Sequence, residues 1–460
     1  MSLKTVAATE WSEAAARLAS RLENLVATDK IREGAGRWLT LKADNLPRLD
    51  LLHWLSCQEA GLKLYWLDRE RQFEAAGLWA AEEIITNLSD LCASPIPAGE
   101  HPPYFGGCRF DLAYPAEVWS KLWENFHGGI FVLPLVLLQR RGNEYSLACH
   151  VDRTAGPSDV LTSISPVLAD LTFDEAAPPL TDPGPYHRTD QPEFAGWKKS
   201  VDAALKMFHR GEAQKIVLAR ETRLDFEQEA SPWPILNNLR KTAASCYLFG
   251  FQPVEGTAFI GASPERLYRR VNREIKTEAV AGTRPRGGDD ERDLELQQDL
   301  LYAAKDRHEH NLVTDSLHHS LEDLCERITG ETRPSILKLS RVQHLSKTIT
   351  GRLKRDATDG DILTRLHPTP AVGGFPRQAA LEAIRELEGF DRGWYAGPIG
   401  WLSNDEAEFA VAIRSGLVQG RTLTLYSGAG IVPGSVAEDE WQEIEQKMSG
   451  FLEAVVGKKC

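Results

Sequence analysis

The chain has 460 residues and a formal net charge of −13, because 66 aspartates and glutamates outnumber 53 lysines and arginines. An acidic excess of this size argues against general affinity for nucleic acids or anionic membranes, so we expect neither as a partner. The hydrophobic content of 42% is that of a globular protein with a full core.

The cysteine pattern and the N-terminus bear on the compartment. The 7 cysteines are odd in number and lack a CxxC pair, a pattern typical of free thiols in a reducing environment. The first residues show no basic segment followed by an apolar one, and no apolar run reaches about 18 residues. These features predict a cytoplasmic protein without a membrane span.

The N-terminal part is predicted to be an amphipathic helix followed by a sheet. Residues 10–28 place Trp11 and Leu18 on one helical side. Between residues 37 and 150, short apolar runs alternate with turns, which predicts antiparallel strands. Residues 176–186, rich in proline and polar side chains, are the one linker-like stretch.

The C-terminal part alternates irregularly between strands and helices, which favours an α+β fold with large antiparallel sheets over a doubly wound parallel sheet. A hairpin is expected between residues 408–418 and 421–432. The predicted strands are 215–226, 246–252, 258–262 and 265–271, and the predicted helices are 194–210, 234–243, 291–328 (long or broken), 377–388 and one at the C-terminus.

Two acidic couples lie on predicted helices far apart in the sequence. Asp306 with Glu309, and Glu440 with Glu443, are each spaced i, i+3, so each couple shares one helical face. Brought together, they would offer the hard oxygen donors that bind Mg²⁺. The alternative is that both couples are solvated helix faces.

Two further residues have the character of an acid–base pair. Lys215 opens an apolar strand, where burial favours the neutral amine and so a general base; the alternative is an edge-strand charge. Glu265 follows Ser263-Pro264 at a break between strands, where a carboxyl can stay protonated and act as a general acid. Its alternative is a turn glutamate paired with Arg266 or Arg269.

Three other features suggest ligand contacts. Residues 279–288 and 426–435 are glycine-rich and are expected as loops after strands, either cradling an anion or making ordinary tight turns. Arg414, expected in a strand above small alanines, is either a carboxylate clamp or a solvent-facing arginine. His344, in a strand-like segment, is either a substrate contact or a structural histidine.

At this point the sequence resembles the chorismate-utilising enzymes, which include isochorismate, salicylate, anthranilate and aminodeoxychorismate synthases. The resemblance is strong over about residues 195–455 and looser before them, as in YFGGCRFD. It rests on motifs in the family's order: KIVLAR, GASPERL, AGTRPRG, KDRHEH, VQHLSKTI, HPTPAVGGFP, GPIGW, AIRSG, SGAGIV and EWQEIEQK.

The resemblance implies the anthranilate-synthase type of chorismate-binding fold, with two large antiparallel sheets packed face to face and helices outside. The N-terminal part, residues 1–190, is then interwoven with this fold, and residues 191–457 form the catalytic region. The implied substrate is chorismate and the implied cofactor is Mg²⁺.

The family's site residues carry over to matching positions of this chain. Glu309 and Glu443 match the metal ligands, and Asp306 and Glu440 match residues that hold the metal's waters. Tyr395 and Arg414 match residues that bind the enolpyruvyl carboxylate. The other implied substrate contacts are Gly282, Thr283, His344, Ala371, Gly428, Gly430 and Lys447.

Three positions bear on the reaction. Ammonia-using members have glutamine where this chain has Lys215, so the resemblance implies water as nucleophile and no amidotransferase subunit. Aminodeoxychorismate synthases have lysine where this chain has Ala281. Salicylate synthases usually have threonine in place of Ala371. The implied activity is that of an isochorismate synthase with Lys215 as base and Glu265 as acid, favoured for menaquinone synthesis. The alternatives are siderophore synthesis, a salicylate synthase, or a chorismate-binding protein without turnover.

Overall fold

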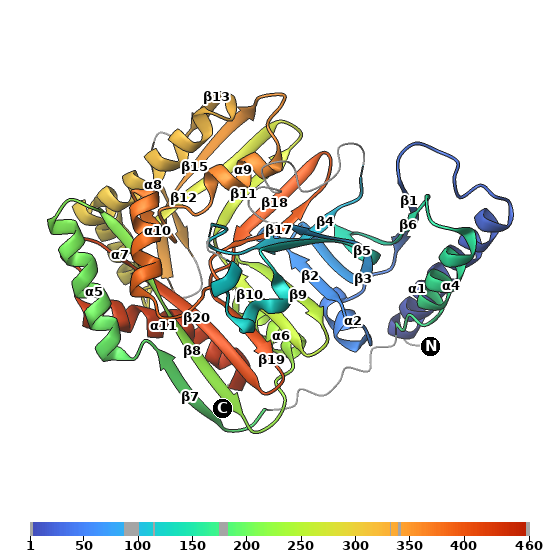
Figure 1. Ribbon diagram of the computed structural model, residues 1–460, viewed down its shortest axis with the longest axis horizontal. Helices are drawn as coiled ribbons and strands as arrows, with labels where there is room; N and C mark the ends of the chain where they lie inside the picture. Colours follow the sequence, from blue (N-terminus) through green and yellow to red (C-terminus); the bar gives the residue numbers. More distant parts are fainter. Residues whose placement is uncertain are drawn as a thin grey trace.

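The computed structural model describes residues 3–86, 101–113, 116–173, 183–331, 333–338 and 342–456. Residues 176–182 of the predicted linker, and Cys92 and Cys460, lie outside the described residues. The strands pair throughout in antiparallel fashion, as the irregular alternation of elements predicts, and form two sheets joined by shared strands (Figure 1).

The first sheet runs from the C-terminal part of the chain into the N-terminal part. Each strand pairs with the next in the order that follows. The order is β7 (Tyr186–Gln191), β8 (Lys215–Phe226), β20 (Thr422–Ile431), β19 (Ser415–Gln419), β10 (Thr257–Ser263), β9 (Tyr247–Val254), β2 (Lys63–Leu67), β3 (Phe73–Thr86), β5 (Gly129–Arg141), β6 (Glu144–Asp152) and β1 (Trp38–Leu46).

The second sheet shares β3 and β5 with the first. Residues 129–132 of β5 pair with β4, whereas residues 136–141 pair with β6, so the long strands pass from one sheet into the other. From β4 (Tyr104–Cys108) the order continues through β17 (Pro398–Leu402), β18 (Glu406–Val411), β11 (Arg266–Val271), β12 (Glu274–Pro285) and β15 (Val342–Leu353), which pairs with β13 (Cys325–Gly330) and β14 (Ser335–Lys338).

The two sheets pack against each other through apolar side chains and a few buried hydrogen bonds. The Tyr247 hydroxyl on β9 donates to Glu408 Oε1 on β18 at 2.8 Å. The Ser263 hydroxyl at the end of β10 donates to the Val411 carbonyl at 2.6 Å. The predicted α+β class with two face-to-face antiparallel sheets is therefore confirmed.

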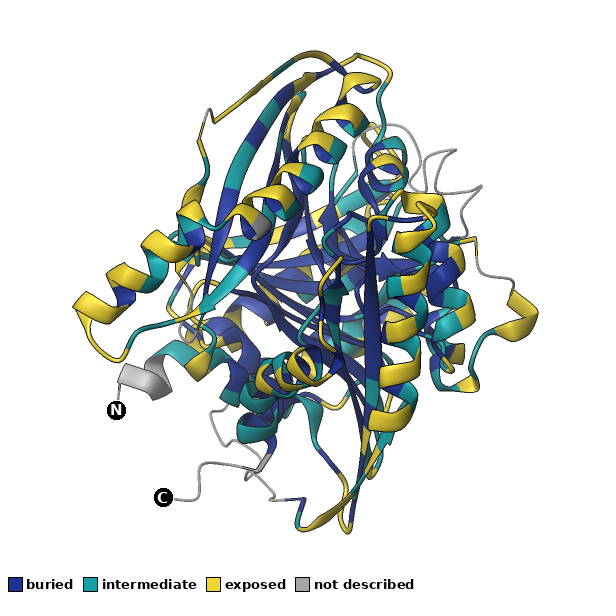
Figure 2. Cartoon of the chain, turned by 90° about the vertical axis from the view of Figure 1, so that its left-hand side faces the viewer, coloured by how far each residue is buried: buried dark blue, intermediate teal, exposed yellow. Residues whose placement is uncertain are grey.

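The helices cover the outside of the sheets, with their exposed faces turned to solvent (Figure 2). Helices α1 and α4 pack on each other beside β1 (Figure 1). None of the described helices has the length and apolar content needed to span a membrane. The helices are α1 (Leu3–Ala27), α2 (Leu51–Cys57), α4 (Pro157–Ala169), α5 (Phe194–His209), α6 (Pro232–Thr242), α7 (Asp290–Tyr302), α8 (Ala304–Glu322), α9 (Asp359–Leu366), α10 (Arg377–Leu387) and α11 (Ala437–Val456).

Two predicted elements are different in the structure. The helix expected over 291–328 breaks at Ala303 and ends at Glu322, and Cys325 then begins strand β13 because residues 325–330 pair with β15. The strand expected over 408–418 is two strands, β18 and β19, because the chain leaves the second sheet after Val411 and enters the first at Ser415.

The glycine-rich segments were expected as loops, and this was wrong. Residues 279–285 belong to β12, where Gly282 sits at a bulge with φ +74°, and residues 426–431 belong to β20. Their backbone groups are paired with β15 and β8 in sheet ladders. They therefore form walls of a site rather than an anion-binding loop.

Candidate active site

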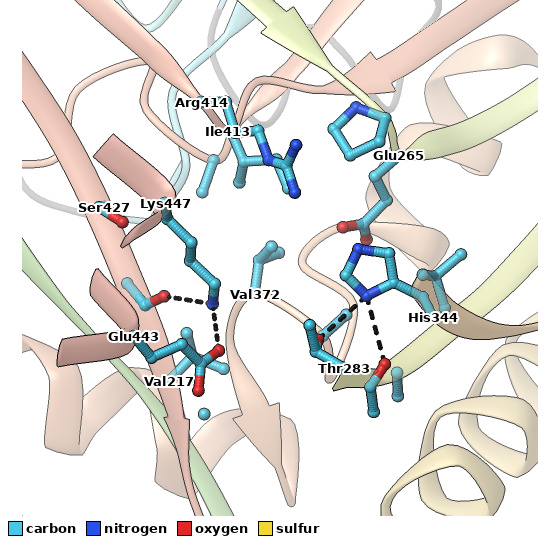
Figure 3. Close-up of a pocket in the computed structure, with 18 of the residues that line it drawn as sticks. Val217, Glu265, Thr283, His344, Val372, Ile413, Arg414, Ser427, Glu443 and Lys447 are labelled. Carbon is cyan, nitrogen blue, oxygen red and sulfur yellow. Dashed lines mark hydrogen bonds and ion pairs between the residues drawn. The ribbon is translucent and has the colours of Figure 1, made fainter. Parts of the chain in front are cut away.

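A pocket lies where the two sheets meet α8 and α11 (Figure 3). All the residues predicted to be catalytic or to bind substrate line it, together with both predicted metal ligands. These residues are Lys215, Glu265, Gly282, Thr283, Glu309, His344, Ala371, Tyr395, Arg414, Gly428, Gly430, Glu443 and Lys447.

Lys215 enters the pocket from the first residue of β8. Its side chain is 2% exposed, and Nζ lies 2.7 Å from Glu309 Oε1 on α8. A Cβ atom on Gly430 would lie 3.0 Å from Lys215 Cε, so a glycine on the paired strand leaves room for the lysine to cross. The lysine is therefore buried inside the pocket and is not an edge-strand charge.

Glu265 occupies the corner between β10 and β11. Burial raises the pKa of its carboxyl to about 7, although Lys215, Lys447 and Arg414 pull it down. The carboxyl has no hydrogen-bond partner among the described residues and faces the pocket (Figure 3). A carboxyl that is half protonated near neutral pH has the property a general acid needs.

His344 forms the wall beside Glu265 (Figure 3). Its Nδ1 lies 3.2 Å from the Gly282 carbonyl and 3.0 Å from Thr283 Oγ1. Burial lowers the pKa of the imidazole to about 4, so the ring is neutral at physiological pH. Because a carbonyl only accepts, Nδ1 carries the proton and Nε2 is left as an acceptor.

Lys447 and Glu443, one turn apart on α11, lie across the pocket from Glu265 and His344 (Figure 3). Lys447 Nζ lies 2.7 Å from Glu443 Oε1 and donates to the Gly428 carbonyl at 2.9 Å. The lysine charge lowers the pKa of Glu443. This side of the pocket therefore carries a fixed ammonium group and an ionised carboxylate.

Arg414 and Tyr395 supply two more polar groups. Arg414 follows the end of β18 with φ 51°, so it does not share a strand face with Ala410 and Ala412 as expected. It sits at the crossing between the sheets, and its guanidinium has no ion-pair or hydrogen-bond partner among the described residues. Tyr395 stacks on Tyr426 at 5.2 Å, with its hydroxyl against Gly428.

In each of the two acidic couples, only one residue lines the pocket. Glu309 and Glu443 line the pocket, whereas Asp306 and Glu440 are not among its lining residues. The Asp306 carboxylate lies behind Gly282 and pairs with Arg284 at 2.8 Å. The role expected of Asp306 and Glu440, holding the metal's waters, thus stays a prediction.

The donor set of the pocket suits Mg²⁺. The described residues contain no group of three or more His, Cys, Asp or Glu side chains placed to hold a metal ion. Mg²⁺, however, is commonly held by one or two carboxylates, with the remaining positions filled by substrate and waters. Glu309 and Glu443 offer such a pair, and each now has a lysine as counter-charge.

A buried ion pair that the sequence did not reveal holds two walls of the pocket. Arg392 and Glu388 are 4% and 3% exposed and lie 2.5 Å apart. Arg392 also donates to the carbonyls of Val217 and Val372, at 2.7 and 3.1 Å, and both valines line the pocket. The i, i+4 spacing was visible in the sequence, but it matches any exposed helical pair, and only burial distinguishes it.

A pocket that gathers carboxyl, amine and guanidinium groups between two antiparallel sheets is that of an enzyme suited to a small anionic substrate. The chain belongs to the family described as chorismate binding enzyme, which matches residues 28–456.

Individual relatives agree with this assignment. The chloroplastic isochorismate synthase 2 of Arabidopsis thaliana is 34% identical over 76% of this chain, which spans only 64% of that protein. The salicylate biosynthesis isochorismate synthase of Pseudomonas aeruginosa is 36% identical over 85% of this chain and 84% of its own. The structure of MenF, the menaquinone-specific isochorismate synthase from Escherichia coli, aligns with a TM-score of 0.82 at 30% identity, covering 95% of this chain and 99% of that one.

The raised pKa of Glu265 predicts a pH-dependent stability. Since burial raises this pKa from 4.5 to about 7, the folded protein holds the proton more tightly than the unfolded chain. The stabilisation is fully present below about pH 4.5 and is lost as the pH rises to about 7, at most about 3 kcal/mol.

Glu265→Gln, which cannot ionise, removes this dependence. We expect the free energy of unfolding of the native protein, measured with denaturant at several pH values, to fall relative to that of the variant across this window. A constant difference between the two proteins from pH 4.5 to pH 7.5 contradicts the assignment.

Proposed function

We propose that this protein is an isochorismate synthase, which converts chorismate to isochorismate. The observation that carries the proposal is the presence of Lys215 and Glu265, a base and an acid candidate, in one pocket with separate cationic groups. Relatives of that name at 34% and 36% identity support it. So does the absence of a lysine at Ala281, which lines the same pocket.

Chorismate carries two carboxylates, and the pocket offers a receptor for each. The unpaired guanidinium of Arg414 and the hydroxyl of Tyr395 receive the enolpyruvyl carboxylate by hydrogen bonds to both oxygens. Lys447, held at the Gly428 carbonyl, lies on the side of Glu443 and receives the ring carboxylate. These cations let an acidic protein bind a dianion.

The reaction adds water at C2 and removes the hydroxyl at C4. For this step Lys215 leaves its ion pair with Glu309 and acts as the free amine, which takes one proton from the attacking water as the C2–O bond forms. The ring double bonds shift, and the C4–O bond breaks as Glu265 gives its proton to the leaving hydroxyl, which departs as water. Both catalytic groups exchange roles in the reverse direction, so the isomerisation is reversible.

The proposed cofactor is Mg²⁺, held by Glu309 and Glu443 with Asp306 and Glu440 behind them. When bound, it neutralises the ring carboxylate and stabilises negative charge that develops there. The Lys447 ammonium group lowers the pKa of Glu443 and so favours the ionised carboxylate that a metal ligand must be.

The proposal also covers the cellular compartment, the subunits and the pathway of the enzyme. We infer a cytoplasmic enzyme, since Cys108, Cys149, Cys246 and Cys325 are free thiols. We also infer that it works without an amidotransferase subunit, because water is the nucleophile. Menaquinone synthesis is the proposed pathway, supported by the alignment with the Escherichia coli enzyme over 95% of this chain, N-terminal part included.

Replacing the base tests the chemistry. Lys215→Ala is expected to lower kcat by a factor of about 10² to 10⁴, the usual contribution of a general base. The measurement is conversion of chorismate in the presence of Mg²⁺, with products separated by chromatography. Lys198→Ala, which removes an exposed lysine paired with Glu438, is the control and should keep the native rate.

Two results would contradict the proposal. A near-normal rate for Lys215→Ala refutes the base assignment. Salicylate and pyruvate as the products of the native enzyme refute the isomerase and support a salicylate synthase.

The metal site is tested by binding rather than by rate. Calorimetric titration with Mg²⁺ should show affinity reduced at least about tenfold in Glu309→Gln and Glu443→Gln, since each loses a charged ligand. Glu322→Gln, on the exposed end of α8, is the matched control and should bind as the native protein does. Unchanged affinity in both pocket variants would remove these residues from the metal site.

A further inference from the structure

The turn between β2 and β3, in the N-terminal part, reaches the back of the pocket corner that carries Glu265. Arg69 in this turn makes two hydrogen bonds to Glu278 on β12, at 2.8 and 2.9 Å. Its Nη1 also donates to the carbonyl of Pro264, at 3.1 Å. Arg69 therefore ties the residue before Glu265 to a neighbouring strand of the second sheet.

The position of the Glu265 carboxyl depends on this corner. Among the described residues its carboxyl has no hydrogen-bond partner, so its place is set by the backbone that carries it. That backbone is held by three hydrogen bonds. The Glu265 amide donates to Ser263 Oγ at 3.2 Å, the Glu265 carbonyl accepts from Val411 at 3.1 Å, and Arg69 binds the Pro264 carbonyl.

We propose that Arg69 is a positioning residue for Glu265, through the Pro264 carbonyl and the Glu278 carboxylate. The proposal deepens the proposed function and rests on it for the role of Glu265. It assigns to the N-terminal part an indirect share in the active site, because Arg69 does not line the pocket and acts through Pro264 and Glu278.

The same contacts make Arg69 an electrostatic neighbour of Glu265. The Glu278 carboxylate, 5% exposed, raises the pKa of Glu265, and Arg69 with Arg266 neutralises much of that charge. Arg266 also pairs with Glu70 and Glu408 behind the corner. The other charged groups that act on Glu265 are Lys215 of β8, Lys447 of α11 and Arg414 between β18 and β19, and His344 of β15 is neutral.

Opposite shifts follow for two variants. Arg69→Gln leaves the Glu278 charge less compensated, so the pKa of Glu265 rises further. Glu278→Gln removes the negative charge and leaves Arg69 and Arg266 in excess, so the pKa of Glu265 falls. If the ion pair had only a structural role, the pKa of Glu265 would not shift in opposite directions in the two variants.

The test combines rate and titration on the full-length protein. In Arg69→Gln we expect kcat to fall about 10- to 100-fold with KM little changed, since a displaced acid impairs the chemical step more than binding. Arg69→Lys keeps the charge but loses the two-pronged contact, so kcat should fall while the titration of Glu265 stays near native. The titration is followed by infrared spectroscopy of the ligand-free protein, with Glu265→Gln identifying the band.

Arg140→Gln is the matched control. Arg140 likewise joins a carboxylate, Glu74, to backbone carbonyls in the N-terminal part, and it does not line the pocket. It should cost stability without shifting the Glu265 band or the ratio of kcat to KM. Equal effects of Arg69→Gln and Arg140→Gln, or an unshifted band with native kcat, overturn the proposal.

Failure of this inference is distinguishable from failure of the proposed function. If the native protein does not convert chorismate, the proposed function fails, while the opposite band shifts still test the coupling of Arg69 and Glu278 to Glu265. If the native protein is active and Arg69→Gln retains native kcat, only the positioning role fails. Should Arg69→Gln not fold, the fall in kcat of Arg69→Lys still tests the positioning role, and the band shift of Glu278→Gln still tests the electrostatic coupling.

Discussion

The rest of the site depends on the burial of one carboxyl group, that of Glu265, among cations that are already engaged. Lys215 is paired with Glu309, and Lys447 with Glu443 and the Gly428 carbonyl, so neither makes a direct ion pair with Glu265. Desolvation therefore outweighs the attraction of the lysines, and the pKa rises to about 7 instead of falling. The result is a carboxyl group that is partly protonated near neutral pH, as the proposed general acid must be.

The fold brings the charged and titratable groups of the pocket together from distant parts of the chain. Lys215 begins a strand of the first sheet, Glu265 lies at a corner that enters the second, and Lys447 comes from the last helix. The long strands β3 and β5 belong to both sheets, so the N-terminal part also fixes how the sheets meet. Through the hydrogen bond from Arg69 to the Pro264 carbonyl, the N-terminal part also contacts the corner that carries Glu265.

Many residues of the pocket could be predicted from the sequence because they belong to short motifs that occur in the family's order. Such motifs can be recognised without knowing the structure of the segments between them. The conformation of those motifs could not be predicted as well. The glycine-rich segments around Gly282 and Gly428 look like loops in isolation, and only pairing with β15 and β8 makes them strands. Arg414 looked like a strand residue because no local signal marks where the chain changes sheets.

Contacts between distant segments could not be predicted from the sequence either, because no local pattern marks them. Nothing around Arg392 shows that its guanidinium holds the Val217 and Val372 walls, and nothing around Arg69 points to Pro264. Each of these arginines is ordinary in its local pattern, and its role follows from burial against a carboxylate and a backbone carbonyl. Long side chains with several donors reach between elements in ways that periodicity does not encode.

If the pocket adds a water molecule at C2 while the C4 hydroxyl leaves, the C2 hydroxyl of isochorismate comes from solvent, and isotope labelling measures its source. Chorismate is incubated with the enzyme and Mg²⁺ in ¹⁸O-water under initial-rate conditions, and the isochorismate formed is analysed by mass spectrometry. We expect one solvent-derived oxygen in the product, located in the hydroxyl at C2. Isochorismate without the label, which would mean that the original hydroxyl migrates, would contradict it.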